Sequence, residues 1–262
     1  MMKDLFSLKG KKAVVTGGSR GIGKMIARGF LEQGADVYIT ARKAPAADQT
    51  AEELGQFGKC VSLPHDLSTV DGCKAFADEY LTHEKTLDIL VNNAGAAWGA
   101  EFEEFPESGW DKVMDLNVKS LFFLTQALFP ALKSSASSDE PSKVINIASI
   151  DGVKINPWET YSYQASKAAV IHLTRRMAAR LIKDNVCVSG IAPGAFASDM
   201  NKVARDAGDA VGGLVPAGRI GKDSDMAGAA VFLASRAGDY VVGDTLAVDG
   251  GVAYSKLDSG VG

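Results

Sequence analysis

Residues 13–23 read AVVTGGSRGIG, a short apolar run followed by four glycines within seven residues. The apolar run predicts a buried strand over 13–16, and apolar side chains at helical spacing predict a helix over 21–33. Glycines let the backbone turn sharply and approach a pyrophosphate, to which a helix N-terminus offers free N–H groups and a positive dipole. The spacing is G-x-x-x-G-x-G, and an ordinary glycine-rich turn is the alternative. We predict that a dinucleotide binds at this turn.

The alternation of strand and helix continues along the chain. Further strands are expected at 37–40, 60–63, 87–91, 144–148, 186–191 and 245–248, and further helices at 46–57, 70–82, 109–133, 160–183 and 224–235. Apolar strands alternating with helices predict βαβ units. The expected fold class is α/β: one domain over residues 1–262, with a doubly wound Rossmann-type parallel sheet of about seven strands flanked by helices. Residues 195–216 are irregular, and we predict a small lid there.

The composition excludes several classes of protein. The 262 residues are 46% apolar and 23% charged, as in an ordinary globular domain, and the net charge of −4 offers no basic field for nucleic acid or a membrane. No apolar run is long enough for a membrane span, and residues 1–12 do not form a signal peptide. The three cysteines are far apart in the sequence, which predicts free thiols. With only three histidines as well, we expect no metal site. We expect a cytoplasmic protein.

The end of the second expected strand indicates which dinucleotide binds. NAD-binding folds place an acidic residue there for the ribose 2′-hydroxyl. This sequence has no carboxylate at that point and carries Arg42 instead. A guanidinium would bind the 2′-phosphate of NADP, with Arg20 of the glycine loop as a second cation. We therefore predict NADP(H) as the cofactor; the alternative is that Arg42 is a solvated loop cation.

Two other strand ends are expected at the same edge of the sheet. Asp66 and Leu67 follow the third strand, and the run from Asn93 through Ala94 to Gly95 follows the fourth. Ligands of open parallel sheets lie at the carboxyl ends of the strands, so these residues are expected at the cofactor. Asp66 would accept a hydrogen bond from the adenine amino group. Alternatively, Asp66 or Ser68 caps the following helix.

A tyrosine and a lysine lie four residues apart in the expected helix 160–183. Tyr163 and Lys167 therefore share one helix face. Tyrosine titrates near about 10 and donates a proton poorly at neutral pH unless a neighbouring charge stabilises its anion. We predict that Lys167 lowers the pKa of Tyr163 and makes it a general acid. Tyr161 lacks such a partner, because Ala165 stands four residues after it.

Taken together, these motifs resemble those of the short-chain dehydrogenase/reductase family over nearly the whole chain. The matching positions, in order, are the 16–23 loop, the 92–95 run, Asn117, Ser149, Tyr163, Lys167, Pro193 with Gly194, and the 249–251 run. The resemblance implies a catalytic tetrad of Asn117, Ser149, Tyr163 and Lys167. In such a tetrad the serine polarises a substrate carbonyl and the tyrosine protonates it. The lysine holds the nicotinamide ribose, and the asparagine holds a water.

The spacing within the tetrad departs slightly from the family. Ser149 and Tyr163 are 14 residues apart, one more than is usual, so we expect the 151–160 loop to bulge. The residues expected to bind the cofactor are Gly17, Ser19, Arg20, Gly21, Ile22, Gly23, Arg42, Asp66, Leu67, Asn93, Ala94, Gly95, Tyr163, Lys167, Pro193, Gly194 and Phe196.

Particular stretches, at 16–27, 92–100 and 108–114, resemble bacterial β-ketoacyl (3-oxoacyl) reductases associated with rhamnolipid synthesis. That resemblance implies reduction of a 3-oxoacyl thioester, carried by acyl carrier protein or by coenzyme A. Trp98, Trp158, Phe196 and Met200 would line an apolar slot for the acyl chain. Enoyl reduction is disfavoured, because that branch of the family separates its tyrosine and lysine by six residues.

Other functions stay open at this point. Fold-level kinship does not determine the substrate, so an NADP-dependent enzyme acting on another ketone or alcohol, such as a sugar, polyol or steroid, is one alternative. A non-catalytic NADPH-binding regulatory protein is another, disfavoured because all four tetrad residues are present. The resemblance also implies a homotetramer, or a dimer, assembled through the helices expected at 109–133 and 160–183.

Overall fold

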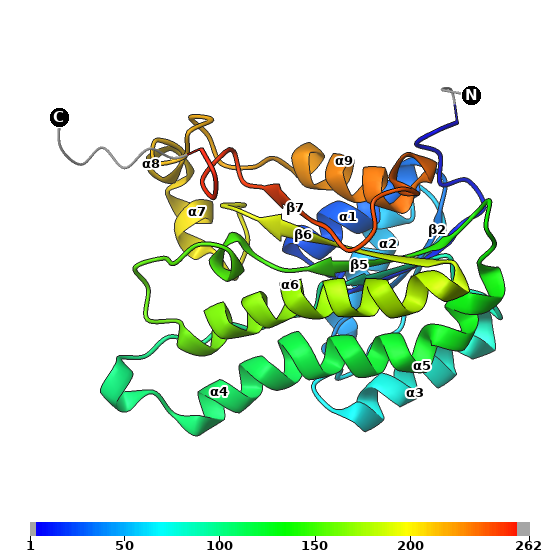
Figure 1. The fold of residues 1–262 in the computed structure, drawn as a ribbon, viewed down its shortest axis with the longest axis horizontal. Helices are drawn as coiled ribbons and strands as arrows, with labels where there is room; N and C mark the ends of the chain where they lie inside the picture. Colours follow the sequence, from blue (N-terminus) through cyan, green and yellow to red (C-terminus); the bar gives the residue numbers. More distant parts are fainter. Residues whose placement is uncertain (1–3, 256–262) are drawn as a thin grey trace.

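The computed structural model describes residues 4–255 and places a parallel sheet between two layers of helices (Figure 1). The strands, in chain order, are β1 (Lys12–Thr16), β2 (Asp36–Thr40), β3 (Cys60–Ser62), β4 (Ile89–Asn92), β5 (Ser142–Ile147), β6 (Val186–Pro193) and β7 (Thr245–Val248). Within the described residues they form one seven-stranded sheet in the order β3-β2-β1-β4-β5-β6-β7, parallel throughout. The predicted α/β fold class is confirmed.

Two hydrophobic cores cover the two faces of the sheet. The helices are α1 (Gly21–Glu32), α2 (Ala44–Leu54), α3 (Val70–His83), α4 (Glu107–Met114), α5 (Ser120–Ser135), α6 (Tyr161–Leu181), α7 (Lys202–Asp206), α8 (Gly208–Gly212) and α9 (Asp223–Ala234). Side chains of α1, α2 and α9 pack on one face, and those of α3, α5 and α6 pack on the other. Central strands such as β4 and β6 are buried along their whole length, which explains why their sequences are apolar without alternation.

The order of the strands creates a binding crevice at one edge of the sheet. The chain leaves β1 through α1 toward β2, whereas it leaves β4 toward β5 on the other side of β1. The loops after β1 and β4 therefore diverge to opposite faces of the sheet. In open α/β sheets ligands bind outside the carboxyl ends of the strands at such a reversal. The glycine loop lies at this point.

The structure corrects the long helix expected at 109–133. A helix begins earlier, at Glu107, and a wider π-helical turn at Asp115–Lys119 separates α4 from α5. This turn contains Asn117, whose side chain hydrogen-bonds a loop outside the helix. Single π turns occur frequently at functional sites. The lid expected at 195–216 contains two short helices, α7 and α8.

The structure also bears on membrane spans, metal sites and cysteines. In the described part of the chain, no helix combines the length and the apolar character needed to cross a bilayer. Residues 4–255 bring together no group of three metal-ligating side chains. All three cysteines are free thiols, with Cys73 and Cys187 buried.

Candidate active site

The glycine loop and the loop after β4 are packed against each other. Gly17 has a φ of +64°, a backbone conformation that glycine adopts without strain. A Cβ on Gly23 would lie 2.3 Å from the carbonyl oxygen of Gly17 and 2.5 Å from Asn93 Nδ2. Asn93 Nδ2 donates hydrogen bonds to the carbonyl oxygens of Thr16, at 2.8 Å, and Gly17, at 3.3 Å. Gly17, Gly23 and Asn93 therefore shape one surface.

Thr16 is a positioning residue that the motif analysis did not single out. Its hydroxyl accepts hydrogen bonds from the backbone N–H groups of Asn93, at 2.8 Å, and Ala94, at 2.9 Å, and donates one to the carbonyl oxygen of Val91, at 3.2 Å. One side chain thus connects the ends of β1 and β4. The sequence signal available was a threonine that ends an otherwise aliphatic strand.

The N-terminus of α1 fits a pyrophosphate. No side chain caps this helix, since the Arg20 side chain makes no capping hydrogen bond, and the first turn holds no acidic residue. The first N–H groups and the positive end of the helix dipole are therefore free to take an anion. The Thr50 hydroxyl donates a hydrogen bond of 2.9 Å to the carbonyl oxygen of Ser19 and holds the loop in place. Gly21 follows with a φ of +51°.

Arg42 and Asp66 lie near one another beyond the ends of β2 and β3, and both are exposed. Asp66 Oδ1 accepts a hydrogen bond of 3.0 Å from the backbone N–H of Ser68. Bonds from Ser68, with a smaller contribution from the positive charge of Arg42, hold the pKa of Asp66 below its usual value. The predictions that Asp66 or Ser68 caps α3 are both wrong. Thr69 is the N-cap of this helix, and its hydroxyl accepts a hydrogen bond of 3.0 Å from the backbone N–H of Gly72.

Arg20 contacts the lid. Its Nη1 lies 2.9 Å from Asp199 Oδ2, and Asp199 Oδ1 also lies 2.8 Å from Nη1 of Arg205 on α7. All three side chains are largely exposed. Arg20, predicted as the second cation for the 2′-phosphate beside Arg42, is therefore already paired with a carboxylate of the 195–216 segment. The sequence contained no signal for this pair, because it joins segments 179 residues apart.

Tyr163 and Lys167 share a face of α6, as predicted. Lys167 Nζ lies 5.5 Å from the centroid of the Tyr163 ring and donates a hydrogen bond of 2.9 Å to the carbonyl oxygen of Ile147. Lys167 is 5% exposed, so its ammonium is largely removed from solvent. The carbonyl at the end of β5 therefore helps to hold the amine in place.

The pKa values at this pair differ from the expectation. The pKa of Tyr163 is raised to about 12, chiefly by burial; a hydrogen bond with Ser149 opposes that rise and the negative charge of Asp151 adds to it. Burial also lowers the pKa of Lys167 to about 8, although Asp151 opposes that shift. The predicted lowering of the Tyr163 pKa is thus not seen, because loss of solvent is the largest effect on both groups and disfavours the charged form of each.

Ser149 follows β5 and is 7% exposed. A 3-10 turn at Ile150–Gly152 follows it, and the Ser149 hydroxyl accepts a hydrogen bond of 3.1 Å from the backbone N–H of Asp151. Its side chain also reaches Tyr163, as the pKa of that tyrosine records. The extra residue between Ser149 and Tyr163 lies in a loop that leaves the two side chains together.

Asn117 is buried and fully hydrogen-bonded. Its Oδ1 accepts from Ala96 N–H at 2.8 Å, and its Nδ2 donates to the carbonyl oxygen of Ala96 at 3.0 Å and to Ser166 Oγ at 2.9 Å. Asn117 therefore ties the loop after β4 to α6, one residue before Lys167. These contacts make it a positioning residue for the tyrosine–lysine pair.

The remaining predicted site residues divide into buried and exposed groups. Leu67 and Phe196 are buried, the first within a core and the second against Gly221. Pro193 ends β6, and Gly194 N–H donates to the carbonyl oxygen of Val248 at 3.0 Å. Leu67, Pro193 and Phe196 are buried and Gly194 is half-buried, and their predicted contacts with the cofactor stay predictions.

The aromatic and apolar residues predicted to meet the substrate lie in different environments. The Trp98 ring packs against Gly109, at which a Cβ would lie 2.7 Å from it, and Lys112 Nζ lies 5.1 Å from its centroid. Trp98 therefore serves packing at the start of α4. In contrast, Trp158 is 66% exposed and Met200 is 54% exposed. These two are available to a ligand.

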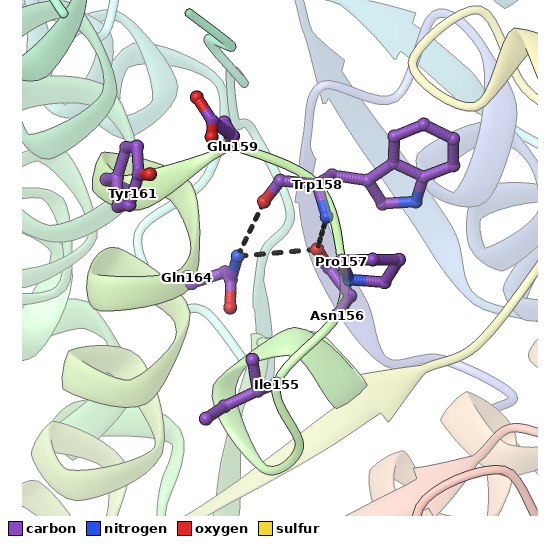
Figure 2. Close-up of a pocket in the computed structure, with 7 residues that line it drawn as sticks. All are labelled: Ile155, Asn156, Pro157, Trp158, Glu159, Tyr161 and Gln164. Atoms are coloured by element: carbon purple, nitrogen blue, oxygen red, sulfur yellow. Dashed lines mark hydrogen bonds between the residues drawn. The ribbon is translucent and has the colours of Figure 1, made fainter. Parts of the chain in front are cut away.

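A surface pocket of about 380 Å³ adjoins Trp158. It is lined by Ile155, Asn156, Pro157, Trp158, Glu159, Tyr161 and Gln164. Figure 2 shows the indole of Trp158 pointing away from Gln164, whose Nε2 donates a hydrogen bond of 3.1 Å to the Trp158 carbonyl oxygen. The pocket is formed by the loop before α6 and the first turn of that helix. Tyr163 is not among the residues that line it.

Comparison with known proteins establishes the class. The family described as Enoyl-(Acyl carrier protein) reductase matches residues 17–253. The rhamnolipids biosynthesis 3-oxoacyl-[acyl-carrier-protein] reductase of Pseudomonas aeruginosa is 46% identical over 95% of this chain and 99% of its own. With the fold and the tyrosine–lysine helix, these matches show that the chain belongs to the short-chain dehydrogenase/reductase family and is an oxidoreductase.

Two further similar proteins differ in the substrates that their names give. The structure of a Pseudomonas aeruginosa RhlG/NADP active-site complex is similar with a TM-score of 0.93 and 45% identity, over 96% of this chain and all of that one. The 2-dehydro-3-deoxy-D-gluconate 5-dehydrogenase of Escherichia coli is 40% identical over 96% of this chain and 98% of its own. The similar proteins thus include both an acyl reductase and an enzyme of sugar acids.

Proposed function

We propose that this protein is an NADPH-dependent carbonyl reductase that converts a 3-oxoacyl thioester to the 3-hydroxyacyl form. The observation that carries the proposal is the convergence of Ser149, Tyr163 and Lys167. Asn117 ties their helix to the loop after β4, and that loop is hydrogen-bonded to the glycine loop through Asn93. The similarity to the Pseudomonas aeruginosa acyl reductase, over nearly the full length of both chains, supports the substrate class.

The cofactor assignment rests on the glycine loop and its surroundings. The uncapped start of α1 would take the pyrophosphate, and Arg42 with Arg20 would take the 2′-phosphate of NADP. Asp66 would accept from the adenine amino group with the carboxylate oxygen that Ser68 leaves free. Several similar structures are NADP complexes, which supports the same choice. When bound, NADPH supplies the hydride.

The protein supplies the proton and the positioning. Ser149 Oγ would hydrogen-bond the carbonyl oxygen of the substrate, and Tyr163 Oη would transfer its proton to that oxygen as negative charge develops. The raised pKa of Tyr163 keeps the hydroxyl protonated at neutral pH. Lys167, with a pKa of about 8, is still mostly charged at pH 7 and would stabilise the tyrosinate that remains.

Exposed apolar side chains near the site fit an acyl chain. Ile155 and Trp158 lie on the loop before α6, and Met200, Val203 and Leu214 lie in the lid; each is more than half exposed. Figure 1 shows that loop and the lid helices α7 and α8 projecting from the same end of the molecule. Covering these side chains with an alkyl chain would release water from both surfaces, which is favourable.

The proposal also covers the carrier of the acyl group, the cellular compartment and the oligomeric state. The acyl group would be carried by acyl carrier protein or by coenzyme A in the cytoplasm. We also propose a homotetramer, or a dimer, assembled through the α4–α5 and α6 faces. The half-exposed aromatic side chains of Trp110, on α4, and Phe122, on α5, support such an interface.

The substrate class is tested with thioesters of increasing chain length. We expect kcat/KM with NADPH to rise from 3-oxobutanoyl to 3-oxodecanoyl thioesters, and Trp158→Ala to reduce that rise by about threefold to tenfold, the worth of one lost apolar contact. Tyr240→Ala is the matched control, because Tyr240 is exposed and precedes β7, at the opposite end of the sheet. A flat chain-length profile in the wild type would contradict an acyl slot.

A second candidate is reduction of a sugar acid, since several similar proteins are gluconate or 2-dehydro-3-deoxy-D-gluconate dehydrogenases. The same assay distinguishes reduction of a 3-oxoacyl thioester from reduction of a sugar acid when 5-keto-D-gluconate is included. We expect 5-keto-D-gluconate to be a poor substrate compared with the 3-oxoacyl thioesters. Crotonyl-CoA is also included, because the matched family is described as an enoyl reductase. We expect no reduction of its double bond.

A further inference from the structure

Asp151 is a carboxylate that the reaction proposed above does not use, although it lies within the catalytic site. It is half-buried in the 3-10 turn Ile150–Gly152, directly after Ser149 and Ile150. Its backbone N–H lies 3.1 Å from Ser149 Oγ, so the residue is fixed beside the group that would hold the substrate carbonyl.

The turn that carries Asp151 is packed tightly against α6. A Cβ on Gly152 would lie 2.5 Å from the carbonyl carbon of Lys167 and 2.7 Å from Ala168 N, so the turn and the helix are in direct backbone contact. The backbone of Asp151 therefore cannot move away from α6 without displacing this turn, so the residue is held close to Ser149 and to the helix that carries Tyr163 and Lys167.

The charges around Asp151 come from few elements. The turn packs on α6 and on β6. β6 reads VCVSGIAP and has no ionisable group except the thiol of Cys187, near its start. α6 brings Tyr163 and Lys167, with its next cations, Arg175 and Arg176, two turns further along the helix. Among the described residues, Asp151 is the charged side chain that acts on both Tyr163 and Lys167.

From this arrangement we propose that Asp151 is a specificity-determining residue that disfavours ketones with a carboxylate close to the reacting carbonyl. The proposal rests on the proposed reductase function and deepens it. A substrate carbonyl that Ser149 holds lies beside Asp151, so a carboxylate two or three bonds away would meet a like charge in a partly desolvated site. A 3-oxoacyl thioester is neutral there. A 3-oxoacid is not.

The matched substrates for the test are ethyl acetoacetate and acetoacetate. They share one ketone and differ in whether the neighbouring carboxyl group is esterified or charged. The wild type should favour the ester in kcat/KM by more than about tenfold. Asp151→Asn should reduce that preference by about fivefold to tenfold, as expected for removing one like charge at a distance of several ångströms. Most of the change should appear in KM for acetoacetate.

Asp151→Asn should leave the catalytic geometry intact. The hydrogen bond to Ser149 comes from the backbone of residue 151, and asparagine is close in shape to aspartate. We therefore expect Asp151→Asn to fold and still to reduce ethyl acetoacetate. The ester and the acid are compared within each protein, so a general change in activity cancels from their ratio. Asp139→Asn is the control, because Asp139 is exposed just before β5, at the other end of the sheet.

The pH profile gives an independent readout. The carboxylate of Asp151 favours the protonated forms of Tyr163 and Lys167, so its removal should move the alkaline limb of kcat/KM for ethyl acetoacetate to lower pH. Asp139→Asn should not move that limb.

Two outcomes would overturn the inference, and they are distinguishable. An unchanged ester-to-acid preference in Asp151→Asn, with the ester still reduced, would contradict the role of Asp151 alone. Failure of the wild-type protein to reduce the ester and every 3-oxoacyl thioester would contradict the proposed function, and the inference with it.

Discussion

Arg20 Nη1 in the glycine loop lies 2.9 Å from Asp199 Oδ2 in the lid. The same arginine is a candidate for binding the 2′-phosphate of NADP, so the lid and the phosphate would compete for one cation. Asp199 also pairs with Arg205 and therefore keeps a partner if Arg20 is withdrawn. Binding of NADP at Arg20 would thus be linked to the position of the 195–216 segment through a single surface ion pair.

This competition predicts that Asp199→Asn binds NADPH more tightly. Exposed ion pairs contribute about 0.2–1 kcal/mol, so the Kd for NADPH should fall by about twofold to fivefold. The Kd for NADH should not change, because NADH has no 2′-phosphate. Fluorescence titration of each cofactor measures both values. Asp206→Asn is the control, since Asp206 pairs with Arg205 and not with Arg20. Equal tightening of NADH would show that Arg20 does not read the phosphate.

The glycine loop predicts a sharp contrast between two glycine substitutions. A Cβ on Gly23 would lie 2.3 Å from the Gly17 carbonyl oxygen, so Gly23→Ala must displace the loop. We expect NADPH binding to weaken by at least about tenfold, the loss of about 1.4 kcal/mol or more.

The comparison for Gly23→Ala is Gly228→Ala in α9, where a Cβ would meet nothing within 4 Å. That substitution should leave the Kd for NADPH unchanged and stabilise the protein by about 0.5–1 kcal/mol, because alanine favours a helix over glycine. Unfolding in urea and cofactor titration measure the two effects. Normal NADPH binding by Gly23→Ala would mean that the dinucleotide does not use this loop.

Burial of Lys167 predicts a function–stability trade-off. Its pKa is about 8 in the folded protein against 10.5 ordinarily, so the unfolded chain binds more protons between these values and stability rises with pH there. Lys167→Met should abolish activity yet increase the free energy of unfolding at pH 7 by up to about 3 kcal/mol. The gain should shrink at pH 10, where the folded wild type no longer buries a charge.

Urea unfolding of both proteins at pH 7 and pH 10 measures this difference. Lys74→Met is the control, because Lys74 is exposed on α3, and its effect should be the same at both values. A gain for Lys167→Met that is equal at pH 7 and pH 10 would contradict a lowered pKa for Lys167.

Local sequence patterns predicted the strands, the glycine turn and the shared face of Tyr163 and Lys167. Those features depend on residues a few positions apart, and β7 has the predicted bounds. Local patterns did not predict the π turn around Asn117. The side chain of Asn117 forms hydrogen bonds with Ala96, which is 21 residues earlier in the sequence. A periodic apolar pattern looks the same on either side of one inserted residue.

Burial was the other feature that the sequence did not reveal. Phe196 and Leu67 follow strands and were expected at the ligand, and the structure shows that the side chains of both are buried in the hydrophobic cores. The pKa of Tyr163 was predicted in the wrong direction for the same reason. The charge on Lys167 is visible in the sequence, whereas loss of solvent around both groups depends on the packing of distant segments.

The central claim is that Tyr163 gives a proton to the oxygen of a substrate carbonyl to which NADPH, when bound, supplies the hydride. The most direct test follows NADPH and NADH oxidation with a 3-oxoacyl thioester, for the wild type and for Tyr163→Phe. The account predicts turnover with NADPH in preference to NADH, and a loss of at least about a hundredfold in Tyr163→Phe with NADPH still bound, as for removal of a general acid. Equal rates for the two proteins would contradict it.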